Sequence, residues 1–180
     1  MAGRTLRYVD PRRRRGVVYR LHAMLMGTRL LGWMSRRIGW KLDPYLLALT
    51  RGRIGMGMGL PTALLETRGA RSGQRRRNGV IYFHDRENVV IVASKLGLST
   101  HPAWFHNLRA DPDVVLGGQP FRAQVVEDED EQQRLWMLAD RVFPSYAAYR
   151  ARAALAGRTI PIVQLIPLRP ARLADCGSPR

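Results

Sequence analysis

Short β-type runs separated by turn residues fill the chain between positions 60 and 168, and this alternation constrains the fold most. Two of the intervals, Asp85 to Asn88 and Gly117-Gly118, predict hairpins, the second with one tight turn. Short strands of this spacing are typical of a β-barrel or a β-sandwich, and the pattern leaves both open. The segments that we interpret as strands are 62–67, 80–83, 89–93, 114–116, 121–126 and 160–168.

Three segments of the same region have helical character instead. Pro102 suits a first helical turn, and the segment that follows it ends at Ala110, just before another proline. The acidic run 127–131 suits a helix N-terminus and precedes apolar residues at helical spacing. A further short helix is expected after Pro144-Ser145. We therefore expect an α+β domain, mainly β, with flanking helices.

The first 59 residues differ in character from this domain. Asp10-Pro11 and the arginine run 12–15 predict a disordered basic arm, because like charges repel one another. From Val17 to about residue 42, apolar residues recur at helical spacing, which predicts an N-terminal amphipathic helix. The glycine-rich segment 51–59 reads as a connector. The expected divisions are the arm 1–16, the helix and connector 17–59, the domain 60–168 and a flexible tail 169–180.

The net charge of +16 is concentrated at the N-terminus. Residues 1–55 hold thirteen Lys or Arg against two Asp, a net of +11, while residues 56–180 hold seventeen against twelve, a net of +5. Such a basic segment attracts nucleic acid or an anionic membrane surface. Residues 12–41 could either contact such a membrane or pack on the domain, and the sequence does not decide between these two alternatives. The arm lacks interleaved stacking aromatics, so we expect no specific nucleic-acid partner.

Several classes of protein are excluded by what the sequence lacks. No stretch reaches the ~18 uninterrupted apolar residues of a spanning helix, and no signal-peptide cleavage signature is present. The single Cys176 rules out a disulfide framework. His101 and His106 do not have the spacing of a zinc-binding helix, so no metal is expected. We expect a cytoplasmic protein, with the inner face of the plasma membrane as a peripheral location.

The turn at residues 67–77 is the most informative short segment, because it is rich in glycine and arginine. Glycines allow successive backbone amides to point the same way, and arginines add bidentate contacts to an anion. We interpret the turn as a phosphate site, with an ordinary hairpin turn carrying solvated arginines as the alternative. It is not a dinucleotide-binding fingerprint, because no helix follows it.

Three other places offer groups for binding. Lys95, beside Ser94 at a strand end, is the only lysine after residue 41 and suits an anion or a ring system, although a solvated loop lysine explains it equally. Residues 101–108 offer a helix N-terminus as an anion site. Trp104 in this segment would either form a wall of the binding pocket or pack in the core. Tyr146 and Tyr149 offer phenols to a carbonyl or nitro oxygen, or pack at a helix boundary. No hydrolytic triad is apparent.

Five segments, taken in order, resemble the deazaflavin-dependent nitroreductase and quinone reductase family of actinobacteria. They are TRGARSGQRRR, VIYFHD, VASKLGLSTHPAWFHNLRADPDV, LADRVFPSYAAYRAR and GRTIPIVQL. The likeness covers about residues 60–168, and the N-terminal part matches only as a basic amphipathic lead-in. The resemblance implies a split β-barrel of the flavin-binding type. It also implies an enzyme that passes a hydride from reduced coenzyme F420 to a quinone-like or nitroaromatic acceptor.

The same resemblance implies roles for individual residues. The residues that would bind coenzyme F420 are Arg71, Ser72, Gly73 and Arg76 at its phosphate-bearing tail, Ser94 and Lys95 along the ring and ribityl chain, and Ala103, Trp104 and Asn107 at the pocket wall. Tyr146 and Tyr149 would border the acceptor site, where either is a candidate proton donor. The chain departs from the family pattern at Leu96, which replaces a common glycine, and at Gly79, which replaces a frequent proline.

Two other functions compete with this interpretation. One is a related split barrel that binds flavin mononucleotide or haem, which the colour of the purified protein would reveal. The other is a basic nucleic-acid-binding protein, which the charge alone suggests. The sequence leaves the oligomeric state open between a monomer and a homodimer. Leu96 would crowd the ring edge or alter acceptor access, so the acceptor is less defined by the sequence than the cofactor.

Overall fold

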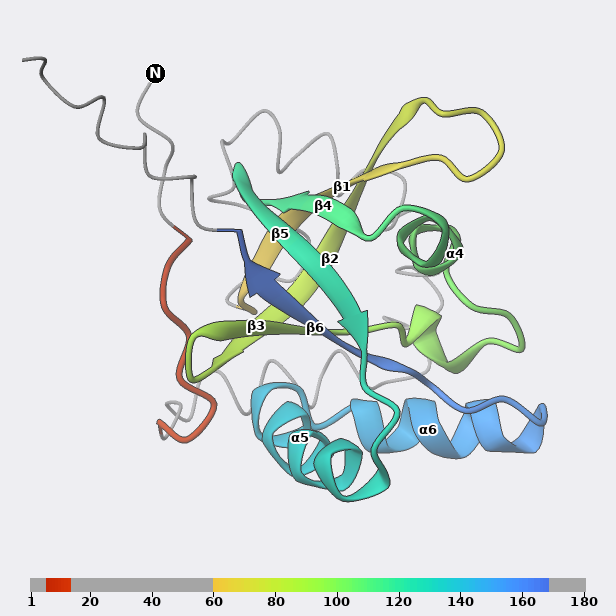
Figure 1. The fold of residues 1–180 in the computed structure, drawn as a ribbon. Helices are drawn as coiled ribbons and strands as arrows, with labels where there is room; N and C mark the ends of the chain where they lie inside the picture. The colour runs from red at the N-terminus through yellow and green to blue at the C-terminus, as the bar shows by residue number, and fades with distance from the viewer. Residues whose placement is uncertain (1–5, 14–59, 169–180) are drawn as a thin grey trace, which may run out of the picture.

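Six antiparallel strands form a closed barrel in the computed structural model, which describes residues 6–13 and 60–168 (Figure 1). The strands are β1 (Thr62–Arg68), β2 (Arg75–Asp85), β3 (Asn88–Val92), β4 (Asp113–Leu116), β5 (Gln119–Val125) and β6 (Ile162–Pro167). Their order around the barrel is β1-β2-β3-β6-β5-β4, and pairing of β4 with β1 closes it. The predicted split-barrel class is confirmed, and the sandwich is excluded.

Within the described residues, three α-helices flank the barrel at the predicted places. They are α4 (Ala103–Ala110), α5 (Glu129–Val142) and α6 (Tyr146–Leu155), and a short turn of 3₁₀ type, η2 (Lys95–Gly97), follows β3. Helix α5 begins at Asp128, whose carboxylate accepts a hydrogen bond from the Glu131 amide at 2.8 Å. This cap and the acidic first turn stabilise the positive end of the helix dipole. In Figure 1, α5 and α6 lie below the barrel and α4 beside it.

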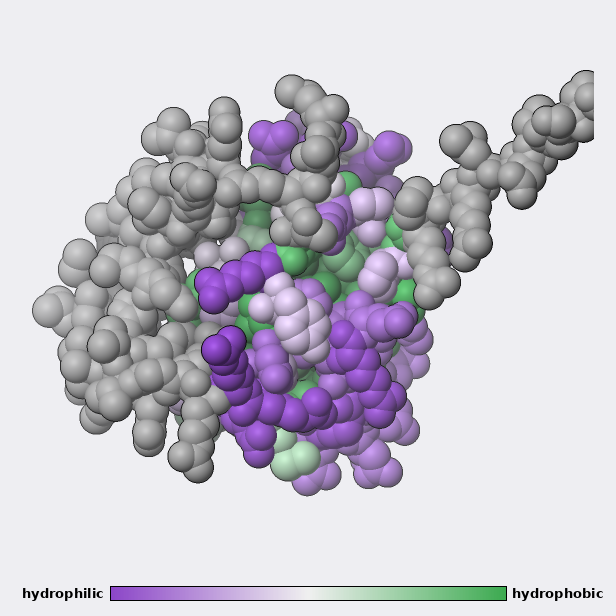
Figure 2. Space-filling model, turned by 90° about the vertical axis from the view of Figure 1, so that its left-hand side faces the viewer, coloured by the Kyte–Doolittle hydropathy of each residue, from purple (hydrophilic) through white to green (hydrophobic). Residues whose placement is uncertain are grey.

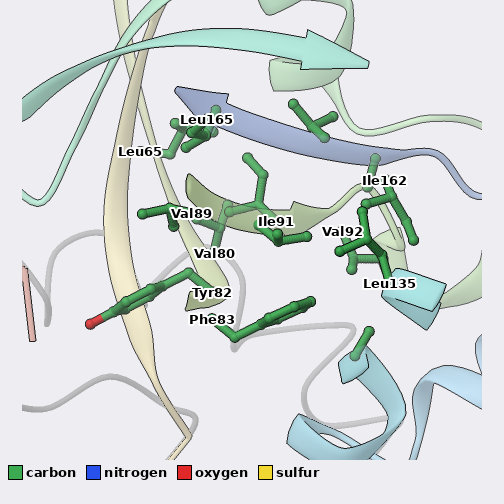
Figure 3. Close-up of a cluster of buried hydrophobic side chains, with 14 of the residues drawn as sticks. Leu65, Val80, Tyr82, Phe83, Val89, Ile91, Val92, Leu135, Ile162 and Leu165 are labelled. Carbon is green, nitrogen blue, oxygen red and sulfur yellow. The ribbon is translucent and has the colours of Figure 1, made fainter. Parts of the chain in front are cut away.

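The core fills the interior of the barrel and extends to α5. Alternate residues of β1 point inward, so Ala63 and Leu65 are buried while their neighbours are less so. Figure 3 shows Leu65, Ile91 and Leu165 meeting inside the barrel, with Leu135 of α5 at its edge. On the face drawn in Figure 2, the described surface is mainly hydrophilic, and hydrophobic residues appear between the polar ones.

The predicted turn between β4 and β5 is confirmed, whereas the predicted start of β2 is wrong. Gly117 and Gly118 have φ of +57° and +87°, which suits the two-residue turn predicted between β4 and β5. Strand β2 begins at Arg75, five residues before the predicted start at Val80. Residues 75–79 pair with β1 but remain largely exposed, so they lack the apolar alternation on which the prediction relied.

Residues 6–13 lie against the barrel, which corrects the prediction of a disordered arm for this part of residues 1–16. The Val9 amide donates to Nδ1 of His84 at 3.1 Å, and the His84 amide donates to the Val9 carbonyl at 2.9 Å. The Tyr82 hydroxyl donates to the Arg7 carbonyl at 3.0 Å. Val9 is buried, so apolar packing adds to these bonds and outweighs the repulsion between arginines.

Other predictions fall on residues that the structure does not describe. These are the start of the arm, the amphipathic helix at 17–42, the connector at 51–59, and the tail at 169–180 with Cys176. The expected domain boundaries therefore stay predictions. Within residues 6–13 and 60–168, no helix has the length and apolar character needed to cross a membrane.

Candidate functional site

The predicted binding residues lie on four segments that follow one another along one side of the barrel. From top to bottom on the right of Figure 1, these are the β1–β2 turn, helix α4, the η2 turn and helix α6. Asn107 of α4 bonds to the β1–β2 turn, and Arg152 of α6 bonds to the η2 turn. Hydrogen bonds therefore join the first segment to the second and the third to the fourth.

The β1–β2 turn closes on itself through its backbone. The Gly69 amide donates to the Gln74 carbonyl and the Gly73 amide to the Gly69 carbonyl, both at 2.8 Å. Gly73 has φ of +64°, which a glycine adopts without strain. Oγ of Ser72 accepts from the Gln74 amide at 3.4 Å and from Nη2 of Arg76 at 3.5 Å. The turn thus gathers a hydroxyl and a guanidinium, groups that suit an anionic ligand.

The arginines that follow this turn divide between two faces of β2, because successive side chains of a strand alternate. Arg75 and Arg77 both approach Oε2 of Glu66, at 3.3 Å and 3.6 Å. Arg76, between them, lies on the face of Ser72. Within the described part of the chain, neither Arg76 nor the exposed Arg71 has an acidic side chain at ion-pair distance. These two cations are therefore available to an anion.

Asn107 fastens the turn to helix α4. Its buried amide accepts from the Ala70 amide and donates to Oγ1 of Thr67, both at 3.1 Å. Trp104, one turn earlier in α4, is buried in the core, as its alternative interpretation stated, whereas Ala103 is exposed. Asn107 therefore positions the turn, and Ala103 lies on the exposed surface of the helix.

We expect the Asn107–Thr67 bond to contribute measurably to stability. Asn107→Leu leaves a buried hydroxyl and a backbone amide without this partner, which should lower the free energy of unfolding by about 1–3 kcal/mol. Thr67→Val should cost less, and a double-mutant cycle in urea should give a coupling of about 1 kcal/mol. Additive effects of the two substitutions would contradict the bond.

The segment after β3 has an unusual backbone. Lys95, Leu96 and Gly97 have φ of +45°, +58° and +74°, so a lysine and a leucine adopt the left-handed region that favours glycine. Nζ of Lys95 donates to Oγ1 of Thr100 at 2.7 Å and to the His101 carbonyl at 3.2 Å. Leu96, the departure from the family pattern, thus occupies a glycine-type conformation that the sequence alone did not reveal.

Two arginines near α6 hold this segment. Nη1 of Arg152 donates to the Leu96 carbonyl at 2.8 Å. Arg158, only 7% exposed, donates to the carbonyls of Ala93, Ser94 and Leu98. Its Nε also donates to Nδ1 of His101 at 3.2 Å. Burial, and next the Arg158 charge, lower the pKa of His101, while burial lowers the pKa of Arg158.

The two predicted tyrosines lie in an aromatic cluster at the start of α6. Tyr146 is buried, with its ring 5.1 Å from Phe143 and 6.0 Å from Trp136. Tyr149 is half-buried, 5.8 Å from Phe143, and its backbone packs against Gly97. The backbone of Tyr149 thus lies next to the η2 turn, and Tyr146 lies among the aromatic rings at the start of α6.

The structure therefore brings the predicted residues together in two groups. One group joins the glycine-arginine turn to Asn107, and the other joins Ser94 and Lys95 to Tyr149. Arg152 and Arg158 belong to the second group, and sequence reasoning assigned neither of them a role. Arg158 lies inside the matched GRTIPIVQL segment, which is the signal that could have pointed to it.

A separate groove of about 580 Å³ lies between the end of α4, strands β5 and β6, and the start of α5. Arg109, Gln124, Glu131 and Gln164 are among the residues that line it, and none of the predicted site residues does. Its rim carries carboxylates, which would repel a phosphate-bearing ligand. We therefore place the candidate site on the basic side of α4. No cluster of metal-binding side chains occurs within residues 6–13 and 60–168.

The closed barrel, with a glycine-arginine turn bonded to α4 and an arginine-braced turn before it, defines a split-barrel protein. The family model described as F420H(2)-dependent quinone reductase matches residues 46–167. The chain belongs to this family, and it is an oxidoreductase whose cofactor is coenzyme F420. The resemblance stated from the five segments is confirmed. The flavin mononucleotide or haem alternative and the nucleic-acid alternative are not favoured.

Individual relatives agree with this assignment. An F420H(2)-dependent quinone reductase of Mycobacterium tuberculosis is 35% identical over 144 residues, which cover 74% of this chain and 95% of the relative. A solved F420-H2 dependent reductase is 32% identical, with a TM-score of 0.51 over 58% of this chain and 93% of that one. A second structure, described as a domain-swapped dimer, is 27% identical, with a TM-score of 0.53 over 67% and 93% of the chains.

Proposed function

We propose that this protein binds coenzyme F420 along α4, with its phosphate-bearing tail at the β1–β2 turn and its ring at the η2 turn, and reduces a quinone. The observation that carries the proposal is the placement of Arg76 with Ser72 at one end of the face and Lys95 with Ser94 at the other. Helix α4 contacts the first group through Asn107 and begins beside the second.

At the tail end, a phosphate would meet hydrogen-bond donors that no described acidic group neutralises. Arg71 and Arg76 supply guanidinium groups, which suit the paired oxygens of a phosphate. Ser72 adds a hydroxyl, and Gly73 allows close approach of the backbone, since no side chain lies there. Asn107 does not need to touch the cofactor in this proposal, because its buried amide already holds the turn in place.

At the ring end, Ser94 and Lys95 would lie along the ring and ribityl chain, with Ala103 at the wall. Trp104 supports that wall from the core. Reduced coenzyme F420 supplies a hydride, which is a two-electron transfer. The chain's own task is to orient the acceptor over the ring and to exclude water. Tyr149, which is half-buried, or Tyr146 would donate a proton to a quinone oxygen.

The family description supports a quinone as the acceptor, with a nitroaromatic compound as an alternative of similar shape and electron demand. Natural quinones are lipid-soluble, so contact of the basic residues 12–41 with an anionic membrane would bring the enzyme to its substrate. The structural relative described as a domain-swapped dimer supports a homodimer as the assembly. Sedimentation with anionic vesicles and light scattering test these two additions.

Fluorescence titration with coenzyme F420 tests the proposed site, with Arg76→Ala compared with Arg75→Ala. The two arginines are adjacent, but Arg75 approaches Glu66 on the other face of the strand. We expect the Arg76 variant to bind about tenfold or more weakly, because it loses a charge-assisted phosphate contact. The Arg75 variant should bind within about twofold of the wild type. Equal losses would indicate only a general charge effect.

The same titration with flavin mononucleotide is the control for the cofactor. Preferential binding of coenzyme F420 supports the proposal, and turnover with a short-chain quinone should then follow. Binding of flavin mononucleotide alone would reject it.

A further inference from the structure

Three consecutive residues after β3 hold a left-handed backbone that two of them disfavour. Lys95 and Leu96 have Cβ atoms, which approach the following carbonyl oxygen too closely in this conformation. Strained backbone of this kind persists only where the surroundings determine it, and it tends to occur at functional sites. The side chains that hold the η2 turn in this conformation therefore help to shape the site.

The guanidinium of Arg158 is the central support of this turn. It donates to carbonyls on both sides of the left-handed residues, those of Ala93 and Ser94 before them and that of Leu98 after them. The path of the backbone is thus fixed at its entry and at its exit. Arg152 adds one bond to the Leu96 carbonyl, but its side chain is exposed and makes no second hydrogen bond to the turn among the described residues.

Arg158 is also an exception among the buried groups. A buried charge normally requires an opposite charge, but within residues 6–13 and 60–168 no carboxylate lies at ion-pair distance from Arg158. Backbone carbonyls and Nδ1 of His101 compensate it instead. The buried positive charge therefore lies directly behind Ser94 and Lys95. A residue needed only for packing would not require a charge at this place.

We propose that Arg158 is a positioning residue for the ring end of the cofactor site. It holds the turn that presents Ser94 and Lys95, and it places a buried positive charge beside these two residues, which would contact the ring. The bond from Nε also occupies Nδ1 of His101, so that this imidazole stays neutral with its proton on Nε2. This inference rests on the proposed function, since it assigns Arg158 to the ring half of that same site.

The test compares two ligands, coenzyme F420 and 5-deazariboflavin, a ring-ribityl analogue that lacks the phosphate-bearing tail. Fluorescence titration of the full chain should show that Arg158→Met weakens both ligands about tenfold or more and by the same factor. Arg158→Lys should recover part of the loss, because one ammonium can still bond one or two carbonyls. Arg76→Ala should weaken coenzyme F420 but leave the fragment within about twofold.

Arg150→Met, in helix α6, is the matched control. Arg150 pairs with Asp140 and lies over Trp136, away from the turn, so this variant should bind both ligands as the wild type does. Without ligand, hydrogen exchange should accelerate at the Gly97 and Leu98 amides in Arg158→Met but not in Arg150→Met. This measurement requires no bound cofactor.

The possible outcomes separate the inference from the proposed function. Wild-type binding with unchanged affinities in Arg158→Met overturns only the inference, even if exchange accelerates. A loss confined to coenzyme F420 also overturns it, because the effect would then belong to the tail. If the wild type binds neither ligand, the proposed function fails and the inference fails with it. Should Arg158→Met not fold, the Lys variant decides by the same criterion, with a smaller equal loss for both ligands.

Discussion

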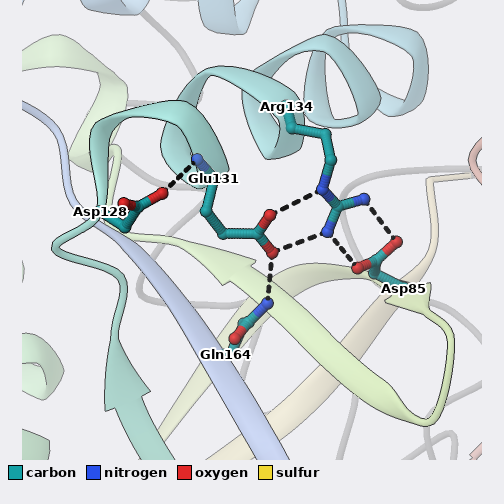
Figure 4. A network of polar contacts seen from close by, with 5 residues as sticks. All are labelled: Asp85, Asp128, Glu131, Arg134 and Gln164. Atoms are coloured by element: carbon teal, nitrogen blue, oxygen red, sulfur yellow. Dashed lines mark hydrogen bonds and ion pairs between the residues drawn. The ribbon is translucent and has the colours of Figure 1, made fainter.

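Replacement of Arg134 by methionine should lower the free energy of unfolding by about 3–5 kcal/mol, because it leaves a buried carboxylate without its partner. Figure 4 shows the Arg134 guanidinium between two carboxylates. It bonds both oxygens of Asp85, which is 4% exposed, and both oxygens of Glu131. Gln164 of β6 adds a bond to Glu131 at 3.1 Å. The network joins the β2–β3 hairpin to α5 and β6.

The pH dependence of this effect has a defined sign. Hydrogen bonds from Arg134 lower the pKa of Asp85 and of Glu131 in the folded protein. The stabilisation is therefore complete above their unfolded pKa values of about 4, and it is lost as the pH falls through the folded values. In Arg134→Met, burial without a partner should instead raise the pKa of Asp85. The stability difference between the two proteins should therefore shrink on acidification.

Urea denaturation at pH 7 and at pH 4 measures both effects. Arg150→Met is the control, because Asp140 keeps about a third of its side chain exposed and can remain solvated. Its cost should be about 1 kcal/mol or less, with little dependence on pH in this range. A loss in Arg134→Met no larger than in the control would mean that Asp85 is solvated in the variant and that the network has no special role.

Gly97→Ala should abolish the tight packing of the η2 turn on α6 and cost about 3 kcal/mol or more. A Cβ at this position would lie 2.5 Å from the Tyr149 carbonyl oxygen and 3.0 Å from its Cα. These are backbone atoms, so neither can rotate away. Gly97 also has φ of +74°, which adds strain for any residue with a Cβ. The turn must therefore move, and Ser94 and Lys95 must move with it.

Gly118→Ala separates conformational strain from collision. Gly118 has φ of +87°, but a Cβ there would meet nothing within 4 Å. We expect a cost of about 1 kcal/mol and unchanged binding of coenzyme F420. Thermal unfolding and fluorescence titration of both variants measure the difference. Equal costs would show that α6 can withdraw from the turn, and that its contact with Gly97 does not hold the site.

The elements of the barrel could be predicted because their signals are local. Apolar alternation located the strands, Pro102 and the acidic run before α5 located helix starts, and Gly117-Gly118 located a turn. The exposed part of β2 was missed because its order comes from pairing with β1, which lies across the turn. Residues 6–13 were missed for a similar reason, since His84 and Tyr82 that bind them lie more than 70 positions away.

The sequence was sufficient to predict which segments form the candidate site, but not which side chains contact one another there. Positions 75–77 are all arginine, so the sequence does not distinguish them. Only the pairing of β2 with β1 shows that Arg75 and Arg77 approach Glu66. Arg158 is one arginine among many, and its importance comes from the carbonyls of a distant turn. Such partners are set by topology, so no spacing within the sequence reveals them.

The closing pair of the barrel differs from the other pairs in length. The ladder between β1 and β4 has the two pairs Leu65–Leu116 and Glu66–Val115, with one further bond from the Gly117 amide to the Leu64 carbonyl, whereas each remaining pair of neighbouring strands is joined along a longer ladder. Local unfolding begins where the fewest bonds are lost, so we expect the barrel to open at this seam first. The β4–β5 hairpin would then stay attached to β6 while its outer edge becomes unpaired. A second copy opened in the same way can complete both edges, which is the geometry of strand exchange between protomers.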